Sequence, residues 1–268
     1  MPIDSTRAEI ISSPQNALLK DIRRAVQRGE LTEEGLIVAE SFHLLEEALR
    51  SDAEVAAVLV AKSVRSAVDS HIRGLRRVRL LMLTDAAFAA VSTTEASQGV
   101  IALVKPRLWT IDDTMRGRAA VVVLDGIQDP GNAGTILRSA EAFGATGILA
   151  VKGSVSLFNA KTLRASAGSL FRLPFVQQVD VEIARAVLEQ HRLDLYAAHP
   201  RGNRLLHDAD LTRKFALIVG AEGRGVSDRL KANAIDLRIP TTTVESLNAA
   251  TAAGVILYEA SRQRMVRP

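Results

Sequence analysis

The feature that most constrains the fold is a regular alternation of short apolar runs with helix-like segments. Between residues 119 and 268, apolar runs such as 120–124 and 215–219 alternate with stretches whose apolar residues recur at helical spacing. Strands that are apolar throughout belong in a sheet covered by helices on both faces, because only there does each face avoid water. The pattern therefore predicts an α/β fold with a parallel, doubly wound sheet.

The N-terminal part of the chain shows the same alternation on a smaller scale. The first expected helix begins at Ser13-Pro14, an N-cap followed by proline at the first helical position, and ends at Gly29. Pro106 and the polar stretch that follows it interrupt the pattern. We therefore divide the chain into an N-terminal α/β domain (1–108), a linker (109–118) and a C-terminal domain (119–268).

Element bounds follow from the same patterns. Expected strands lie at 36–39, 55–60, 78–83, 100–104, 120–124, 148–151, 174–176, 193–197, 215–219 and 235–239. Expected helices lie at 41–50, 64–72, 86–91, 134–143, 160–170, 181–191, 226–232 and 247–265.

Composition excludes several classes of protein. The 268 residues include no cysteine, which rules out disulfides and zinc–thiolate sites. The five histidines show no metal-ligand spacing, so we expect no metal. The opening residues lack a signal-peptide pattern and no apolar run is long enough to span a bilayer, so we expect a soluble cytoplasmic protein. A formal net charge of +4 permits an anionic partner but does not identify one.

The first chemistry-bearing segment is Asp129-Pro130-Gly131-Asn132-Ala133-Gly134, which leads from an apolar strand into a helix. Backbone N–H groups at such a helix start favour an anion. Asn132 could cap the helix or present its amide to a substrate. Arg138, six residues later, could form a surface salt bridge or anchor a phosphate.

The second segment is Gly220-Ala221-Glu222-Gly223-Arg224-Gly225, at the end of an apolar strand. Its glycines allow a close approach of backbone to a ligand. Their spacing, G-x-x-G-x-G, differs from the G-x-G-x-x-G of dinucleotide-binding loops, which argues against a nucleotide-dependent oxidoreductase. Glu222 could be a surface acid, or it could orient Arg138 or a substrate.

The third segment joins Ile239-Pro240, at a strand end, to Glu245-Ser246-Leu247-Asn248 at a helix start. Ser246 is a candidate N-cap, and its hydroxyl, with the Asn248 amide, could equally hold a ribose. Small residues follow at positions 249, 250 and 252–254. They indicate close helix packing, within the fold or across a dimer.

These three segments, in this order, resemble the three motifs of the SpoU (TrmH-type) branch of the SPOUT methyltransferases. The resemblance implies a parallel-sheet domain with a deep trefoil knot, a homodimer, and S-adenosylmethionine bound between the knotted loops. Residues 1–108 are similar to the accompanying RNA-binding domain, which is related to ribosomal protein L30e. The implied activity is transfer of a methyl group to the 2′-hydroxyl of a ribose in structured RNA, with ribosomal RNA favoured over transfer RNA.

Site residues follow from the resemblance by motif position. Asn132, Arg138, Glu222, Ser246 and Asn248 form the substrate-side, catalytic set. Gly220, Ile239 and Leu247 contact the cofactor, largely through backbone groups. Guanidinium keeps its proton in almost every protein, so we expect Arg138 to act as an electrostatic anchor and not as a general base.

Two questions stay open at the level of sequence. A noncatalytic RNA-binding or ribosome-assembly protein could retain the same fold, although the presence of the polar motif residues argues against it. Two basic groups could track RNA phosphates or could be ordinary solvated faces. They are Lys20, Arg23, Arg24 and Arg28 in the first helix, and Arg73, Arg76, Arg77 and Arg79 further along.

Overall fold

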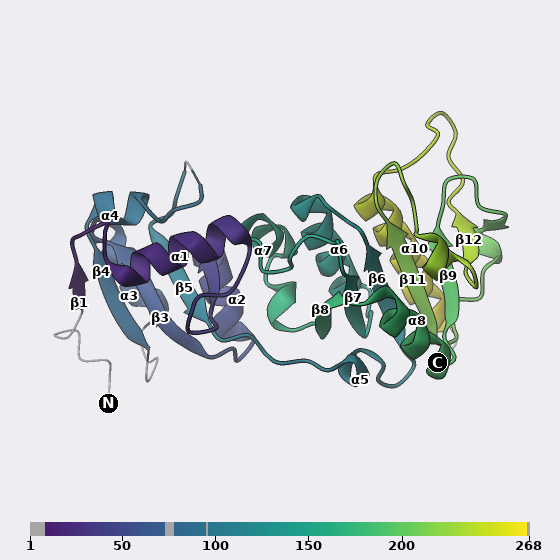
Figure 1. Ribbon diagram of the computed structural model, residues 1–268, viewed down its shortest axis with the longest axis horizontal. Coiled ribbons are helices and arrows are strands. Elements are labelled where there is room, and N and C mark those ends of the chain that lie inside the picture. Colours follow the sequence, from purple (N-terminus) through teal and green to yellow (C-terminus); the bar gives the residue numbers. More distant parts are fainter. Residues whose placement is uncertain (1–8, 73–77, 95, 267–268) are drawn as a thin grey trace. The chain divides into compact units, whose positions relative to one another are not determined.

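The computed structural model describes residues 9–72, 78–94 and 96–266 (Figure 1). The chain forms two compact units. Unit 1 comprises residues 1–107 and 158–171, and unit 2 comprises residues 108–157 and 172–268. This division differs from the expected one at residues 158–171. They come from the C-terminal part of the sequence but pack in unit 1.

Unit 2 is built on one seven-stranded sheet. Its elements are α5 (Ile111–Thr114), β6 (Ala120–Asp125), α6 (Pro130–Ala142), β7 (Gly147–Val151), β8 (Phe175–Val179), α8 (Val181–Gln190), β9 (Asp194–Ala198), β10 (Arg204–Leu205), the 3₁₀ turn η4 (Leu206–Asp208), β11 (Phe215–Gly220), α9 (Asp228–Lys231), β12 (Ile235–Arg238) and α10 (Ala249–Val266). The strand order is β10-β12-β9-β11-β6-β7-β8. Every pairing is parallel, as the apolar runs predicted.

Helices cover both faces of this sheet. Val121 and Val123 of β6 belong to a buried cluster with Ala184 and Leu188 of α8. The alternate residues of β6 point to the opposite face, where α6 and α10 pack against each other and contact β7 and β11. The core strands are buried throughout, with β6 and β7 buried along their whole length.

The expected linker is part of unit 2. Within 109–118, Thr110 caps the short helix α5, and its side chain and that of Asp113 exchange hydrogen bonds with each other's backbone N–H. The short strand β10 was not expected from the sequence, and α9 is shorter than the expected helix 226–232.

The end of α10 is held by a half-buried arginine. The Arg264 guanidinium donates to the backbone carbonyls of Leu211, Arg118, Ala119 and Arg213, at 2.6–3.1 Å, and lies 4.8 Å from the centre of the Phe215 ring. Burial, with a smaller effect of Arg118, lowers the pKa of Arg264 to about 10. The side chain therefore remains charged at neutral pH and ties the C-terminal helix to the start of the sheet.

Unit 1 contains a smaller, mixed sheet. Its elements are β1 (Glu9–Ile11), α1 (Ala17–Arg28), β2 (Ile37–Glu40), α2 (Phe42–Arg50), β3 (Val55–Ala61), the 3₁₀ turn η2 (Lys62–Val64), α3 (Arg65–Ile72), β4 (Arg79–Leu83), α4 (Asp85–Ala89), β5 (Val100–Val104), α7 (Ala160–Ser166) and the 3₁₀ turn η3 (Ser169–Phe171). The strand order is β1-β4-β3-β5-β2. β1, β4 and β3 are parallel, and β5 runs antiparallel to β3 and β2.

The first helix begins later than expected. Asn16 is its N-cap, accepting a hydrogen bond from the N–H of Leu18, and the expected cap at Ser13 lies outside the helix. Gly29 ends it in the left-handed conformation, as expected. Leu19 and Ile22 of α1 are fully buried in the core of unit 1.

The segment 158–171 packs on β2 within unit 1. α7 contacts β2, and Arg164 Nη1 donates to Thr93 Oγ1 at 2.9 Å. Gly168 adopts φ +89° and approaches Glu47 so closely that an added Cβ would stand 2.5 Å from the Cβ of that residue. A side chain at 168 would therefore disrupt the contact.

A buried carboxylate organises the loop that precedes β5. Glu40, only 5% exposed, accepts hydrogen bonds from four hydroxyls and one backbone N–H. The donors are Ser92 Oγ (2.6 Å), Thr93 Oγ1 (2.5 Å), Thr94 Oγ1 (3.3 Å), Ser97 Oγ (2.8 Å) and Thr93 N (2.8 Å). Burial alone would raise the pKa of Glu40, but the hydrogen bonds outweigh it and lower the pKa below the ordinary 4.5.

We expect the Glu40→Gln substitution to lower the free energy of unfolding at pH 7 by about 2–3 kcal/mol, because an amide cannot accept all five hydrogen bonds. Since the folded-state pKa of Glu40 lies below its unfolded value of 4.5, its stabilisation is present above that pH and is lost as the pH falls through the folded-state pKa. In urea unfolding, the difference in free energy of unfolding between the wild type and the variant should therefore decrease as the pH falls through the folded-state pKa of Glu40. The control is Glu54→Gln, at an exposed surface ion pair; an equal effect of the two variants would contradict the assignment.

Candidate functional site

A pocket of about 650 Å³ lies where the parallel strands of unit 2 end. The carboxyl ends of β9, β11 and β12 meet at this edge, where open α/β sheets bind their ligands. The walls come from residues 198–200, 219–225 and 245–249, with Leu237, Ile239, Thr241, Ala252 and Ile256. The pocket therefore brings together Gly220, Glu222, Ile239, Ser246, Leu247 and Asn248 from the second and third segments.

The glycine-rich loop after β11 forms one wall and turns tightly. Gly225 N donates to Ala221 O at 2.8 Å, and these two residues form an isolated antiparallel bridge. A Cβ added at Gly220 would stand 2.1 Å from the carbonyl carbon of Gly225. Only glycine fits at 220, so the loop exposes backbone to the pocket.

Three polar side chains from the three segments form one hydrogen-bonded cluster. Asn132 Nδ2 donates to Glu222 Oε1 at 2.5 Å. Asn248 Nδ2 donates to Asn132 Oδ1 at 3.0 Å and approaches Glu222 Oε1 at 3.4 Å. Glu222 Oε2 has no hydrogen-bond partner among the residues that the structure describes, so it can accept from a ligand.

Neither suggested helix cap is correct. The N-cap of α6 is Asp129, whose side chain accepts from the N–H of Asn132, with Pro130 at the first helical position. Asn132 lies inside the first turn, so its amide is available to the cluster. At α10, Asn248 Oδ1 accepts from the N–H groups of Ala250 and Thr251, which makes Asn248 the cap in place of Ser246.

Arg138 stands apart from this cluster. It is exposed on α6 and makes no hydrogen bond or ion pair with any described residue. Glu222 is bonded to the two asparagines and not to Arg138, contrary to one of the two roles considered for it. Ser246 is also exposed. Both side chains are therefore open to a ligand that approaches from solvent.

Asp125 was not singled out from the sequence. It ends β6 directly opposite Gly220 of β11, is 9% exposed, and its Oδ2 accepts from the backbone N–H of Ser227 at 2.6 Å. This bond fixes the far end of the glycine-rich loop. A carboxylate that ends an otherwise apolar run was the available signal.

His199 was likewise missed. It lines the pocket, and its Nδ1 accepts a hydrogen bond from the N–H of Arg201 at 3.1 Å. In the neutral ring the proton is therefore on Nε2, which can donate.

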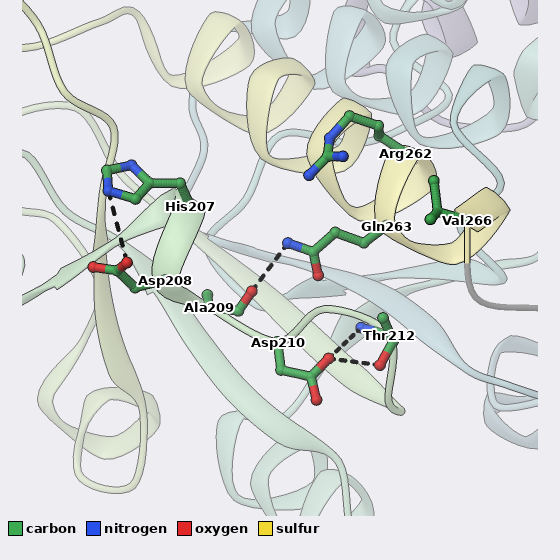
Figure 2. A pocket seen from close by; sticks show the side chains of 8 residues that line it. All are labelled: His207, Asp208, Ala209, Asp210, Thr212, Arg262, Gln263 and Val266. Carbon is green, nitrogen blue, oxygen red and sulfur yellow. Dashed lines mark hydrogen bonds and ion pairs between the residues drawn. The ribbon is translucent and has the colours of Figure 1, made fainter.

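A second pocket, of about 380 Å³, lies away from these segments between η4 and the end of α10 (Figure 2). Its polar groups are largely paired within the protein. Asp210 accepts from Thr212 N and Oγ1, and Gln263 donates to Ala209 O (Figure 2). It contains none of the predicted site residues.

Two further searches concern the described residues alone. None of their helices is both long and apolar enough to cross a membrane. They also contain no group of three or more His, Asp or Glu side chains placed to hold a metal ion.

Comparison with known families matches both halves of the chain. The model of the SpoU rRNA Methylase family matches residues 119–258. The model of the MRM3-like substrate binding domain matches residues 16–102.

Individual proteins are similar over most of the chain. The chain is 31% identical over 250 residues to "23S rRNA (guanosine(2553)-2′-O)-methyltransferase RlmP" of Bacillus subtilis, which covers 92% of this chain and 97% of that protein. It is 36% identical over 178 residues to "23S rRNA (guanosine-2′-O-)-methyltransferase RlmB" of Xanthomonas campestris, covering 63% and 71%.

Solved structures show the same architecture. The SpoU methyltransferase AviRb from Streptomyces viridochromogenes, in complex with the cofactor AdoMet, superposes with a TM-score of 0.83 at 26% identity and covers 94% of this chain and 99% of that one. An AdoMet-bound rRNA methyltransferase from Sinorhizobium meliloti gives a TM-score of 0.78 at 27% identity, covering 95% and 98%.

We expect Asp125→Ala to weaken binding of S-adenosylmethionine roughly tenfold, because a buried hydrogen bond to a charged acceptor contributes about 1.5–3 kcal/mol to the order of the glycine-rich loop. Isothermal titration calorimetry measures the affinity directly. Asp228→Ala, an exposed aspartate at the start of α9, is the matched control. Equal affinities for Asp125→Ala and the wild type would show that this carboxylate does not order the loop.

Proposed function

Because this chain belongs to the SpoU rRNA methylase family, we propose that the pocket and the cluster of Asn132, Glu222 and Asn248 are its active site. The chain is an S-adenosylmethionine-dependent RNA 2′-O-ribose methyltransferase. We infer that ribosomal RNA is its substrate, since RlmP and RlmB carry that substrate in their names. The observation that carries the site assignment is the convergence of all three segments on one edge of the sheet.

The pocket suits S-adenosylmethionine in size and chemistry. Its volume of about 650 Å³ lies within the roughly 300–1,000 Å³ usual for such ligands. Val219, Leu237 and Ile256 supply apolar surface for an adenosine. We propose that Gly220, Ile239 and Leu247 hold it through backbone groups, because Gly220 ends β11 and the other two lie in the connection between β12 and α10. The bound cofactor supplies a methyl group on a positively charged sulfur.

We propose that the substrate ribose lies against the asparagine–glutamate cluster. Glu222 Oε2 is free to accept a hydrogen bond from a hydroxyl, and the two asparagine amides fix the direction of the carboxylate. Ser246, exposed beside the pocket, completes the wall with a hydroxyl. Such fixed partners contribute mainly by orienting the reacting oxygen.

Arg138 has a different role in this proposal. Its guanidinium is exposed and unpaired among the described residues, so it can bind an RNA phosphate and stabilise developing negative charge on the ribose oxygen. It does not remove the proton, because guanidinium remains protonated. Proton transfer to solvent or to the substrate phosphate fits the open position of the site.

We infer that the backbone of unit 2 forms a trefoil knot. Two observations support this. β12 lies beside β9, on the opposite side of β11 from β6. The next helix, α10, nevertheless packs against α6, which follows β6. The connection 239–248 must therefore cross the carboxyl end of β11, beside the tight loop 220–225.

We propose further that residues 1–108, with 158–171 packed in the same unit, form an L30e-like RNA-binding domain, joined through 109–118 to the catalytic segments within 119–268, and that the protein acts in the cytoplasm. The basic face of α1 is smaller than its sequence indicated. Arg23 donates to Ala90 O, and Arg24 pairs with Asp21 and Glu33. Lys20 and Arg28 remain exposed. Arg79 pairs with Glu9, while Arg73, Arg76 and Arg77 lie outside the described residues.

We also propose that two copies form a homodimer through α6 and α10. Tyr258, 56% exposed, packs edge-on against Phe143 at the end of α6, with ring centres 5.6 Å apart. Val255, on the same helix, is 38% exposed. Exposed apolar side chains next to small helix residues provide a surface that a second copy can cover.

The activity is tested by transferring a labelled methyl group to ribosomal RNA lacking the modification and locating the product by mass spectrometry. Arg138→Ala should lower kcat/KM about 100-fold and leave S-adenosylmethionine affinity unchanged, because it removes an interaction with RNA. Arg185→Ala on α8 is the control. A wild-type protein that binds RNA and transfers no methyl group would instead favour a noncatalytic RNA-binding protein.

The dimer proposal predicts that Tyr258→Arg will halve the mass measured by analytical ultracentrifugation, since an unpaired charge is costly in an apolar interface. The control is Arg262→Ala, on the same helix. A wild-type chain that sediments as a monomer would rule the proposal out.

A further inference from the structure

Unit 1 holds a cavity of about 600 Å³ at the carboxyl ends of two of its parallel strands. Its base is formed by Ala61 at the end of β3 and by Phe88 of α4. Its polar lining comes from Ser63 and Asp85 and from the hydroxyl-bearing residues Ser92, Thr93, Thr94 and Ser97. Gly99 and Val64 also line the cavity and lie close together, since a Cβ at position 99 would stand 2.6 Å from Val64 Cγ2.

The hydroxyl groups around this cavity already donate their protons to carboxylates of the protein. Those of Ser92, Thr93, Thr94 and Ser97 point to the buried carboxylate of Glu40. The proton of Ser63 points to Asp85 Oδ1 at 2.8 Å. A hydroxyl has a single proton, so these groups can offer a ligand only lone pairs.

The charge of the lining also favours a ligand that donates hydrogen bonds. Asp85 is exposed, its Oδ1 accepts from Ser63 N and Oγ, and its Oδ2 has no partner in the described part of the chain. None of the described residues that line the cavity is a lysine, arginine or histidine. The described lining therefore presents hydrogen-bond acceptors and a carboxylate, which favours a ligand that donates hydrogen bonds over an RNA phosphate.

We propose that this cavity binds an unpaired guanine base of the RNA substrate, with its N1–H and N2–H groups on the Asp85 carboxylate. The proposal rests on the proposed function, which makes RNA the partner, and on the match of residues 16–102 to a substrate binding domain. Guanine presents two adjacent donors on one edge. Asp85 can accept one at its free Oδ2 and the other at Oδ1, where the present bond from Ser63 N is long at 3.3 Å. Bases that are splayed out of single-stranded RNA expose that edge.

Hydrogen bonds to Glu40 hold the side chains of Ser92, Thr93, Thr94 and Ser97 without any ligand. Arg164 Nη1 donates to Thr93 Oγ1 at 2.9 Å, so the segment 158–171 also holds the Thr93 side chain. Because these side chains are already hydrogen-bonded within the protein, little of their conformational freedom is lost on binding.

The test measures fluorescence anisotropy of the full chain with labelled RNA hairpins that differ only in one bulged nucleotide: guanosine, inosine, adenosine, cytidine or uridine. Guanosine should bind roughly tenfold more tightly than uridine, and inosine, which lacks the N2 amine, should lose most of that advantage. Asp85→Asn should remove the preference for guanosine and leave the other affinities unchanged. Asp52→Asn, at another exposed aspartate of unit 1, should change nothing.

Equal binding of the five hairpins, or an equal weakening of all of them by Asp85→Asn, would overturn the proposal. A parallel NMR titration uses free guanosine and N-acetylarginine amide as probes. Amide shifts at Ser63, Thr94 and Gly99 with the arginine derivative and not with guanosine would assign the cavity to a basic partner protein instead. The Asp85→Asn variant should bind S-adenosylmethionine normally, and absence of methyl transfer by the wild type would count against the proposed function alone.

Discussion

The proposed active site depends on hydrogen bonds between residues that are far apart in the chain. Asn132 and Glu222 are separated by 90 residues, and Asn132 and Asn248 by 116. Their side chains nevertheless meet, because α6 and α10 pack together and the strand before Glu222 ends at the same edge of the sheet. Asn248 takes part twice, since its Oδ1 caps α10 while its Nδ2 reaches the cluster. The geometry of the pocket is thus fixed by the starts of two helices.

The glycine-rich loop adopts backbone conformations that favour glycine, and hydrogen bonds hold it at two points. Gly223 and Gly225 have φ values of +84° and +71°, which side chains rarely permit. The same loop is attached at Ser227 by Asp125 and at Glu222 by the two asparagines. Backbone is therefore exposed to the pocket without being left free to move away from it.

Sequence predicted the strands of unit 2 well, because a strand buried on both faces must be apolar along its length, and few other elements combine that composition with such short runs. Helix starts were predicted poorly. Ser13 and Asn16, or Ser246 and Asn248, are chemically equivalent caps, and tertiary contacts decide between them. The partners of Glu222 could not be predicted, since they depend on the packing of α6 against α10.

The same limit applies to unit 1. The alternation of its elements was apparent, but the network around Glu40 was not, because a single acid at the end of an apolar strand does not reveal five donors that lie more than 50 residues away. The packing of 158–171 with the N-terminal half also has no local signature. Its apolar and small residues are typical of any helix in an α/β domain.

That packing has a practical consequence for anyone who wishes to study the halves separately. The backbone passes from one unit to the other at 107/108, 157/158 and 171/172, so no single cut releases either unit intact. A truncation at the expected boundary would leave β2 without α7 and Thr93 without Arg164. To prepare unit 1 alone, the segment 158–171 would have to be joined to residues 1–107, and to prepare unit 2 alone it would have to be removed. Only the uncut polypeptide keeps all the packing partners of both units.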